Sequence, residues 1–205
     1  MEKVLGSPQS ILWAYYNILR ILILDFHNTT DESEKKEKAF LVIIVSVTII
    51  EAFLNIYFFL LVSEEKYSHH MEHLKNEIKK TTFPLDKKVN QWPMLLFNKN
   101  VDFGSGVGQK FMNLKNLRNK LLHFQSDHNE LDIKNIKITK LLDITIYEEL
   151  AQYDVDSCQS IVLDFASEIF RLAGIQEDKI PHFIHSWFGD LSRIKGKNAN
   201  NLFNK

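Results

Sequence analysis

The chain contains very little cysteine, glycine or proline, and each shortage excludes a class of protein. Cys158 is the only cysteine in 205 residues, so an intrachain disulfide framework is excluded and a reducing, cytoplasmic setting is expected. With only 7 glycines and 4 prolines, few residues interrupt helices, which favours long helices over a sheet protein with many turns. Cys158 itself is expected to be a small core residue.

The chain also has no excess of charge of either sign. It carries 25 basic and 26 acidic residues, so it lacks the overall excess of positive charge that is typical of nucleic-acid-binding proteins. A hydrophobic content of 45% indicates a globular chain, expected to form a single domain over residues 1–190. The polar residues 191–205 are expected to fray. The N-terminus does not match a secretory signal, because Glu2 dilutes its positive charge and Asn17 and Arg20 interrupt the apolar run.

Helical spacing of apolar residues predicts an all-α, up-and-down helical bundle. A first helix is expected from about Pro8 to Phe26, and Thr30 or Asp31 is suited to cap the next one. Helical spacing returns at 147–153 and again at 155–173, where Gly174 is a natural stop. Between the central and the C-terminal helices, the alternating stretch "IKNIKITK" predicts a short β excursion around 131–146.

Residues 39–62 are almost wholly apolar and allow two interpretations. About 20 apolar residues suffice to span a bilayer, so the segment is long enough for a membrane helix. Glu51 lies near its middle, where a carboxylate costs roughly 2.5–3.5 kcal/mol on insertion scales, and Asn55 follows on the same face. A buried central helix whose polar pair faces a site or a partner is therefore favoured, and a membrane anchor remains the less favoured alternative.

The stretch "LRNKLLHF", residues 117–124, concentrates chemically useful side chains on one amphipathic helix. Asn119 and His123 are four residues apart and share a face, while Arg118 is one step round the helix. Histidine transfers protons near neutral pH, and guanidinium is a permanently charged fork for phosphate. The apolar residues that recur at helical spacing, and that are expected to be buried, are Leu114, Leu117, Leu121 and Phe124.

The same helix is locally cationic. Between Val107 and Phe124 there is no acidic residue, and Lys110, Lys115 and Lys120 accompany the arginine. These three lysines are the expected contacts for an RNA backbone. The competing interpretation is an ordinary solvated basic helix face.

The pattern Arg118, polar Asn119, then His123 resembles the Arg-polar-x-x-x-His signature of the HEPN superfamily of small all-helical domains. The resemblance extends to "IIEAFLN", which contains Glu51 and Asn55. It implies a metal-independent ribonuclease of a toxin–antitoxin, abortive-infection or antiviral defence system, with no cofactor. It also implies a homodimer that brings two copies of the motif into one cleft, and an antitoxin or other regulatory protein as a partner.

In such a ribonuclease the RNA 2′-hydroxyl attacks its own adjacent phosphate, leaving a 2′,3′-cyclic phosphate and a 5′-hydroxyl. His123 would move the proton, and Arg118 would hold the phosphate and stabilise the transition state. Asn119 would orient His123 or the phosphate. Glu51 would support the site by pairing with Arg118, and Asn55 by bridging to backbone or to Asn119. Alternatively, the two residues form a buried polar pair that satisfies only the neighbouring helices. The main alternative is a non-catalytic module that binds RNA, a nucleotide or a protein.

Two further patterns carry less weight. His69 and His73 are four apart, but no third ligand accompanies them, so a solvated helix face is favoured over a metal site. The stretch "GSGVG" lacks the spacing of a phosphate-binding fingerprint and predicts a flexible loop at 97–109 that leads into the motif helix.

Overall fold

The computed structural model describes residues 7–65, 72, 76, 84–123, 129–133, 136–141 and 144–189. The His69–His73 pair, most of the polar stretch 63–80 and the tail 191–205 lie outside these residues. The elements are α1 (Gln9–Asn28), α2 (Glu32–Leu61), α4 (Leu85–Phe97), α5 (Gly106–His123), β1 (Asn129–Ile133), β2 (Ile136–Leu141), α6 (Thr145–Glu148), η2 (Glu149–Gln152), α7 (Val155–Leu172), η3 (Glu177–Lys179) and α8 (Ile180–Phe188).

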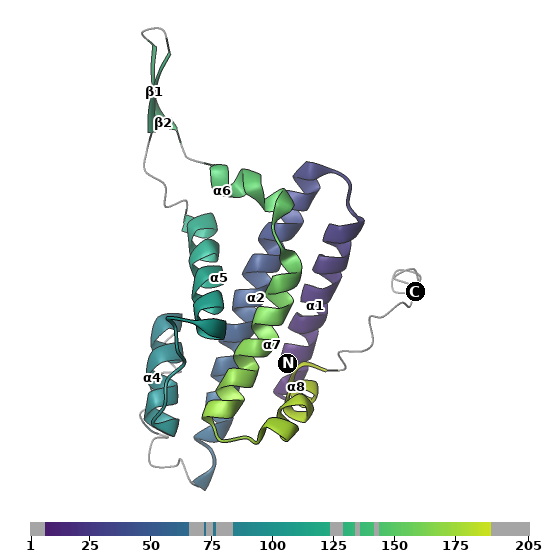
Figure 1. The fold of residues 1–205 in the computed structure, drawn as a ribbon, viewed down its shortest axis with the longest axis vertical. Helices are drawn as coiled ribbons and strands as arrows, with labels where there is room; N and C mark the ends of the chain where they lie inside the picture. The colour runs from purple at the N-terminus through teal and green to yellow at the C-terminus, as the bar shows by residue number, and fades with distance from the viewer. Residues whose placement is uncertain are drawn as a thin grey trace, which may run out of the picture.

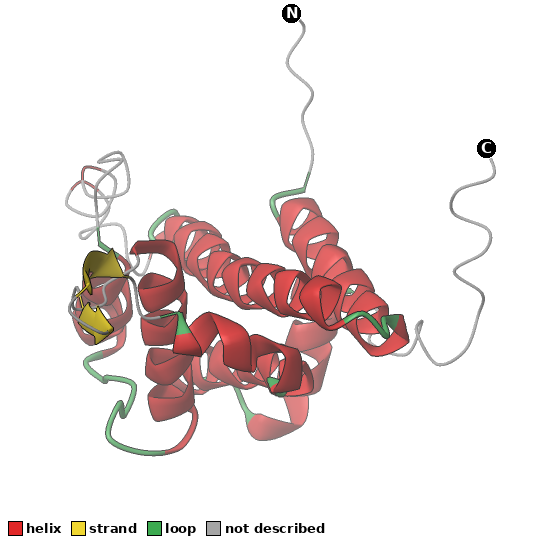
Figure 2. Ribbon diagram, turned by 90° about the horizontal axis from the view of Figure 1, so that it is seen from above, coloured by secondary structure: helices red, strands yellow, loops and turns green. Residues whose placement is uncertain are grey.

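The helices form a bundle around α2, which confirms the predicted all-α fold (Figure 1). α2 packs against α1, α7, α5 and α4. Seen from above, α1 and α2 form a pair of long helices along one side of the bundle (Figure 2). α5 and α1 lie on opposite sides of α2 and α7, so the predicted motif helix is at one edge of the molecule (Figure 1).

The turn between α1 and α2 is closed by a helix cap. The Asp31 side chain accepts a hydrogen bond of 2.8 Å from the Glu34 backbone N–H, which satisfies one of the free donors of the first turn. Glu32 and Glu34 place negative charge at the positive end of the helix dipole. The prediction that Thr30 or Asp31 caps this helix is thus confirmed, with Asp31 in that position.

α2 is apolar almost all round from Ala39 onward, and other helices cover about half of this apolar part. Among the described residues it is the one helix long and apolar enough to cross a membrane by length and composition, with a mean hydropathy of 2.4. In the bundle, 50% of the apolar 18-residue segment of this helix is buried. The hydroxyl of Ser46, which is fully buried, donates to the Val42 carbonyl at 2.7 Å, so this polar group needs no further partner.

Aromatic side chains join the C-terminal helices to α2. Phe53 and Tyr57 stack with ring centroids 5.4 Å apart, and both meet Phe170 of α7 and Trp187 of α8 edge-on. Such pairs contribute about 0.5–1.5 kcal/mol each beyond the area they bury. This cluster fixes the position of α8 at one end of the bundle.

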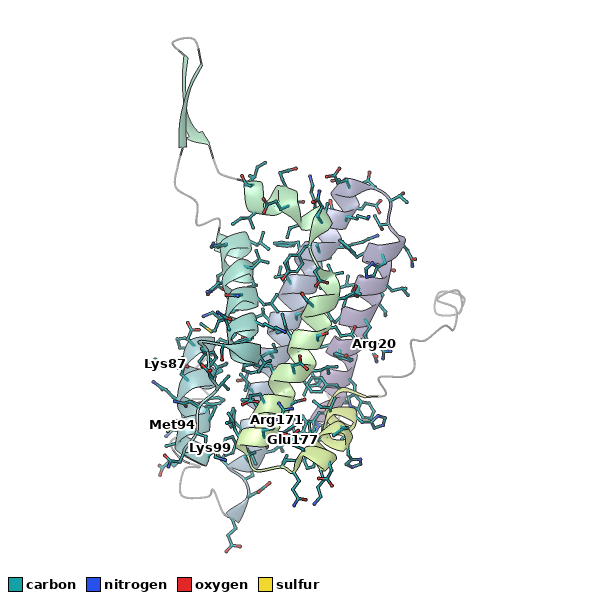
Figure 3. All side chains as sticks on the ribbon, in the orientation of Figure 1. Arg20, Lys87, Met94, Lys99, Arg171 and Glu177 are labelled. Carbon is teal, nitrogen blue, oxygen red and sulfur yellow. The ribbon has the colours of Figure 1, made fainter. Side chains whose placement is uncertain are left out.

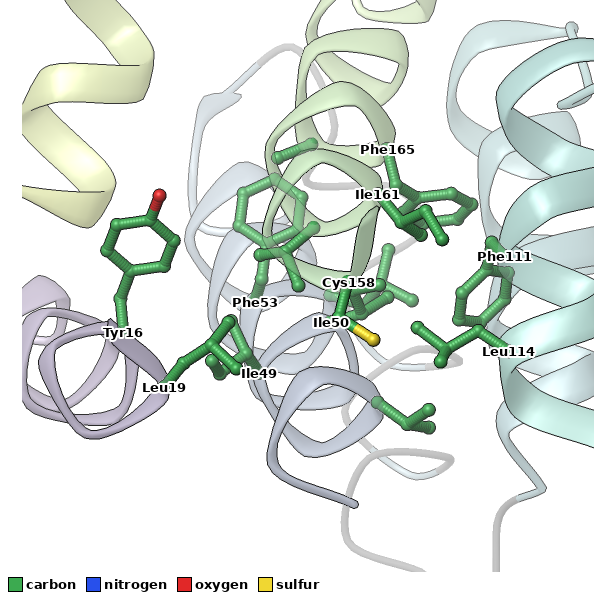
Figure 4. Packing of buried hydrophobic residues seen from close by; sticks show 14 of the residues in the cluster. Tyr16, Leu19, Ile49, Ile50, Phe53, Phe111, Leu114, Cys158, Ile161 and Phe165 are labelled. Carbon is green, nitrogen blue, oxygen red and sulfur yellow. The ribbon is translucent and has the colours of Figure 1, made fainter. Parts of the chain in front are cut away.

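Cys158 of α7 is fully buried between α2 and α5, which confirms it as a core residue (Figure 4). Burial raises the pKa of its thiol to about 12, because the thiolate would lose its hydration. Close by, Phe111 of α5 and Phe165 of α7 approach to 4.4 Å between ring centroids. The motif helix is therefore anchored to the bundle by its apolar face.

Gly174 ends α7 as predicted, with a φ of +85° that disfavours other residues. Beside this turn the Arg171 guanidinium donates to Glu177 at 2.6 Å and to Glu168 at 3.2 Å (Figure 3). The first of these ion pairs links α7 to η3 and so to the start of α8.

A hairpin separates α5 from α6. β1 and β2 pair antiparallel, with Leu131 opposite Ile138 and Ile133 opposite Ile136, and project from one end of the bundle (Figure 1). The predicted β excursion is present, but it lies at 129–141 and not at 131–146. Residues 145–152 are helical instead, although the alternation of apolar and polar residues continues through residues 142–146.

Candidate functional site

The motif helix α5 begins at a tightly folded loop. The Asp102 carboxylate accepts hydrogen bonds from the Ser105 hydroxyl at 2.6 Å and from the Gly104 N–H at 2.8 Å. These bonds, the Ser105 one foremost, hold the pKa of Asp102 below its usual range. A Cβ at Gly108 would lie 2.1 Å from the Asp102 carbonyl oxygen. Only glycine allows the loop to cross the first turn of α5 so closely.

The expected apolar stripe of α5 is confirmed over the described residues. Leu114 and Leu121 are buried and Leu117 is half-buried, and Phe111 adds a fully buried ring to the same face. Phe124 lies outside the described residues. Packing of this stripe orients α5 so that its amides and several of its cations lie toward solvent.

Arg118 and Asn119 are half-buried on α5, and neither has a hydrogen bond or ion pair with another described residue. His123 is the last residue of α5, and its side chain is not among those that the structure describes. Each residue turns an α-helix by about 100°, so positions 119 and 123 are separated by roughly 40° and positions 118 and 123 by roughly 140°. Asn119 thus shares a side of the helix with position 123, and Arg118 emerges on another flank.

The three lysines of α5 have different surroundings. Lys110 and Lys120 are exposed, and neither forms an ion pair within the part of the chain that the structure describes. Lys115 is only 5% exposed, and its ammonium forms an ion pair with Asp86 of α4. The prediction that Lys115 contacts an RNA backbone is therefore wrong, because the bundle covers this side chain and a carboxylate neutralises it.

Glu51 pairs with a lysine and not with the motif arginine. Its Oε1 atom is 2.7 Å from the Nζ of Lys88 on α4, and no ion pair joins it to Arg118 in the described residues. The expected Glu51–Arg118 pair is therefore wrong. Asn55, four residues on, is half-buried and has no hydrogen bond to another described residue. With Asp86 and Lys115, the Glu51–Lys88 pair ties α4 to both α2 and α5.

An open groove runs along the solvent side of α5. Its wider part, about 670 Å³, lies between α5 and the first half of α7, and a hollow of about 390 Å³ continues it along α5. The two parts share Asn113 and Leu117 and are called the α5 groove below. The other polar α5 residues that line it are Lys110, Asn116, Asn119 and Lys120.

The facing wall of the α5 groove is acidic. It carries Asp154, the N-cap of α7, together with Asp156 and Asp164 within α7. Asp156 pairs with His27 at 3.0 Å and Asp154 caps α7, whereas Asp164 has no partner among the described residues. Carboxylates repel phosphate but accept from exocyclic base amines. The groove therefore suits a phosphate at its Lys120 end and hydrogen-bond donors at its α7 wall.

Tyr153 lines the same wall. Burial raises the pKa of its phenol above the usual value, so the hydroxyl remains protonated and able to donate. No pattern in the sequence predicted Tyr153 and the three aspartates as groove residues. Tyr153 and Asp154 precede α7, and no local signal in the sequence says that Asp156 and Asp164 face α5.

Comparisons with protein-family models, with curated proteins and with solved structures found no match for this chain. Within the described residues, no group of three or more histidine, cysteine or acidic side chains is placed to hold a metal ion. The residues and geometry of the α5 groove are therefore the basis for inferring a function.

Proposed function

We propose that the protein is a metal-independent endoribonuclease whose catalytic groups are Arg118 and His123 on α5. One observation carries the proposal: Arg118 has no hydrogen bond or ion pair with another described residue, and it lies on the helix that forms one wall of an open groove. The buried lysines nearby behave differently, because Lys88 and Lys115 are each neutralised by a carboxylate. A cation that served only the fold would be paired in the same way.

The reaction would form a bond between the RNA 2′-oxygen and phosphorus and break the bond to the 5′-oxygen. His123 would take the proton of the 2′-hydroxyl or give a proton to the leaving 5′-oxygen. Arg118 would bind the non-bridging oxygens, where negative charge grows in the transition state. Asn119, which lines the groove, would orient the histidine or the phosphate. Lys110 and Lys120 would hold the flanking backbone.

A homodimer fits this chemistry. Because positions 118 and 123 are separated by roughly 140° around an ideal helix, a second copy of the motif would supply the opposite catalytic group more easily than the same chain would. The HEPN resemblance implies such a composite site, together with an antitoxin or regulatory partner, a cytoplasmic location and a role as a toxin or antiviral effector. These roles follow by analogy.

A non-catalytic module that binds RNA, a nucleotide or a protein is the second candidate. The acidic wall of the groove favours it, since Asp154, Asp156 and Asp164 would accept base or peptide donors without any bond being cleaved. A membrane anchor at 39–62 is the weakest candidate, because α2 packs against several helices. Monodisperse expression without detergent would eliminate it.

Cleavage of labelled RNA in EDTA tests the proposal. Wild-type protein should give 2′,3′-cyclic phosphate ends, and an all-DNA strand of the same sequence should stay intact. His123→Ala and Arg118→Ala should each lose about 10²–10⁴-fold in rate. His182→Ala, which removes an exposed histidine of α8, is the matched control and should cleave normally. Absence of cleavage by wild type, or equal cleavage by all variants, would contradict the proposal.

The two lysine environments give a binding test on the same groove. Lys120→Ala should weaken RNA binding for all sequences and lower the salt dependence by about 0.7 in log–log slope, as expected for one phosphate contact on a single strand. Lys115→Met should bind RNA as wild type does, because Lys115 is buried against Asp86. Fluorescence anisotropy at several salt concentrations would measure both. Equal losses for the two variants would contradict the placement of the phosphate.

A further inference from the structure

The outward side of α1 is apolar. Ile11, Tyr15, Ile18 and Ile21 are 50%, 36%, 46% and 46% exposed. They recur along the helix at spacings of three and four residues, so they form a continuous stripe on the side away from the core. No described helix covers this stripe.

α2 extends the stripe into a surface two helices wide. Leu19 and Ile49 pack together between α1 and α2 (Figure 4). Outside this seam, Leu41 and Phe59 are each 44% exposed, with Val45 and Ile56 half-buried between them. The α1–α2 apolar face is defined here by its six most exposed large residues: Ile11, Tyr15, Ile18, Ile21, Leu41 and Phe59.

The size of this face matches what a homodimer buries. A large side chain carries roughly 150–250 Å² of surface, so the six exposed residues leave on the order of 500 Å² of apolar area open to water. A standard interface takes about 800 Å² from each partner, and homodimer interfaces are about 65% apolar. The face therefore supplies about the apolar area that one side of such a dimer requires.

The charges around the face favour a second copy in an antiparallel arrangement. None of the six residues is charged. The end formed by the α1–α2 turn is acidic on balance, because its acidic residues outnumber its lysines Lys35, Lys36 and Lys38. The exposed acidic residues there are Asp25, Asp31, Glu32, Glu34 and Glu37, of which Glu34 pairs with Lys38. A parallel pairing would bring these carboxylates together, whereas an antiparallel pairing places them against the Ile11 end of the partner's α1, which carries no charged residue over 9–19. An anionic membrane surface would be repelled by the same acidic end.

We propose that two copies of this chain pair through the α1–α2 apolar face, with a two-fold axis near Ile18. Such an interface is isologous, so each α1 contacts the other in the same way. Because α1 and α5 lie on opposite sides of the bundle (Figure 1), both α5 grooves stay open in this dimer. The interface is thus separate from any pairing of the motif helices and does not depend on the ribonuclease proposal.

Light scattering coupled to gel filtration tests the interface. Wild type should have at least twice the chain mass of 24.0 kDa, and Ile18→Glu should halve the mass. A change from dimer to monomer, or from tetramer to dimer if α5 pairs as well, supports the proposal. Met94→Glu changes an equally exposed apolar residue, 44%, on α4 at the other edge of the molecule (Figure 3). This control should leave the mass unchanged, and both variants should keep the wild-type helical circular dichroism.

A monomeric wild type would overturn the proposal, whether the face is covered by another part of the chain or binds lipid vesicles. An oligomer that survives Ile18→Glu would also overturn it, because pairing would then use another face.

Cysteine cross-linking would determine directly how the two α1 helices are oriented in the dimer. Cys158 is fully buried, so a single introduced cysteine dominates the reaction with a short bis-maleimide. Ile18→Cys should cross-link to itself near the axis. Ile11→Cys should cross-link poorly alone but efficiently when mixed with Asp25→Cys, as the antiparallel arrangement requires. Efficient self-linking of Ile11→Cys without any link at position 18 would refute that arrangement.

Discussion

Removing the carboxylate of Glu51 tests whether this residue supports the fold or serves the α5 groove. Glu51→Gln leaves the Lys88 ammonium, whose side chain is 8% exposed, without its counter-charge. Breaking a fully buried ion pair in this way costs about 3–5 kcal/mol. Because the Glu51 side chain is 38% exposed, solvent screens the pair, and about 2 kcal/mol is expected. For a chain of this size, that lowers the unfolding temperature by about 4–8 °C.

Lys88→Met provides the matched comparison. Methionine fills the buried volume without an ammonium, so this variant should lose only about 1 kcal/mol. The double variant should lose less than the two single losses together, because the stranded charge is gone. Circular dichroism melts and urea unfolding would measure all three, alongside RNA cleavage at a temperature where each variant is folded. A Glu51→Gln variant that melts like wild type yet fails to cleave RNA would refute the structural role.

Two further predictions concern α5 and the core. Gly108→Ala should lower the free energy of unfolding by about 2 kcal/mol, because its Cβ would meet the Asp102 carbonyl and overpacking outweighs the roughly 1 kcal/mol gained in helix propensity. In urea unfolding, Asn116→Ala on the exposed side of α5 should stay within about 0.5 kcal/mol of wild type. Equal stabilities of the Gly108→Ala and Asn116→Ala variants would contradict the close approach of Gly108 to the Asp102 carbonyl. Stability should also fall as the pH rises above 9.0, the ordinary thiol pKa, toward about 12, the pKa of Cys158 in the fold, since only the unfolded chain releases the proton there. Urea midpoints at several alkaline pH values should fall less steeply for Cys158→Ala, and identical slopes would contradict this assignment.

The amino-acid sequence alone determined the helical class and several element ends. Asp31 caps α2 and Gly174 ends α7 where the sequence predicted, because caps and stops depend on backbone groups within one turn of the chain. The apolar stripe of α5 and the burial of Cys158 also followed from local periodicity. The combination of Arg118, Asn119 and His123 was visible for the same reason, since the three residues are neighbours on one helix.

Only the tertiary structure decided which polar residues are free to act. Lys110 and Lys115 are both lysines of one basic helix, yet only Lys115 is buried, because α4 brings Asp86 to it. Glu51 finds its partner 37 positions along the chain, in Lys88. The acidic wall on α7 and the uncovered side of α1 were equally invisible in the sequence. Periodicity reveals that a helix has two sides, but which neighbour covers each side is set by packing between segments distant in sequence.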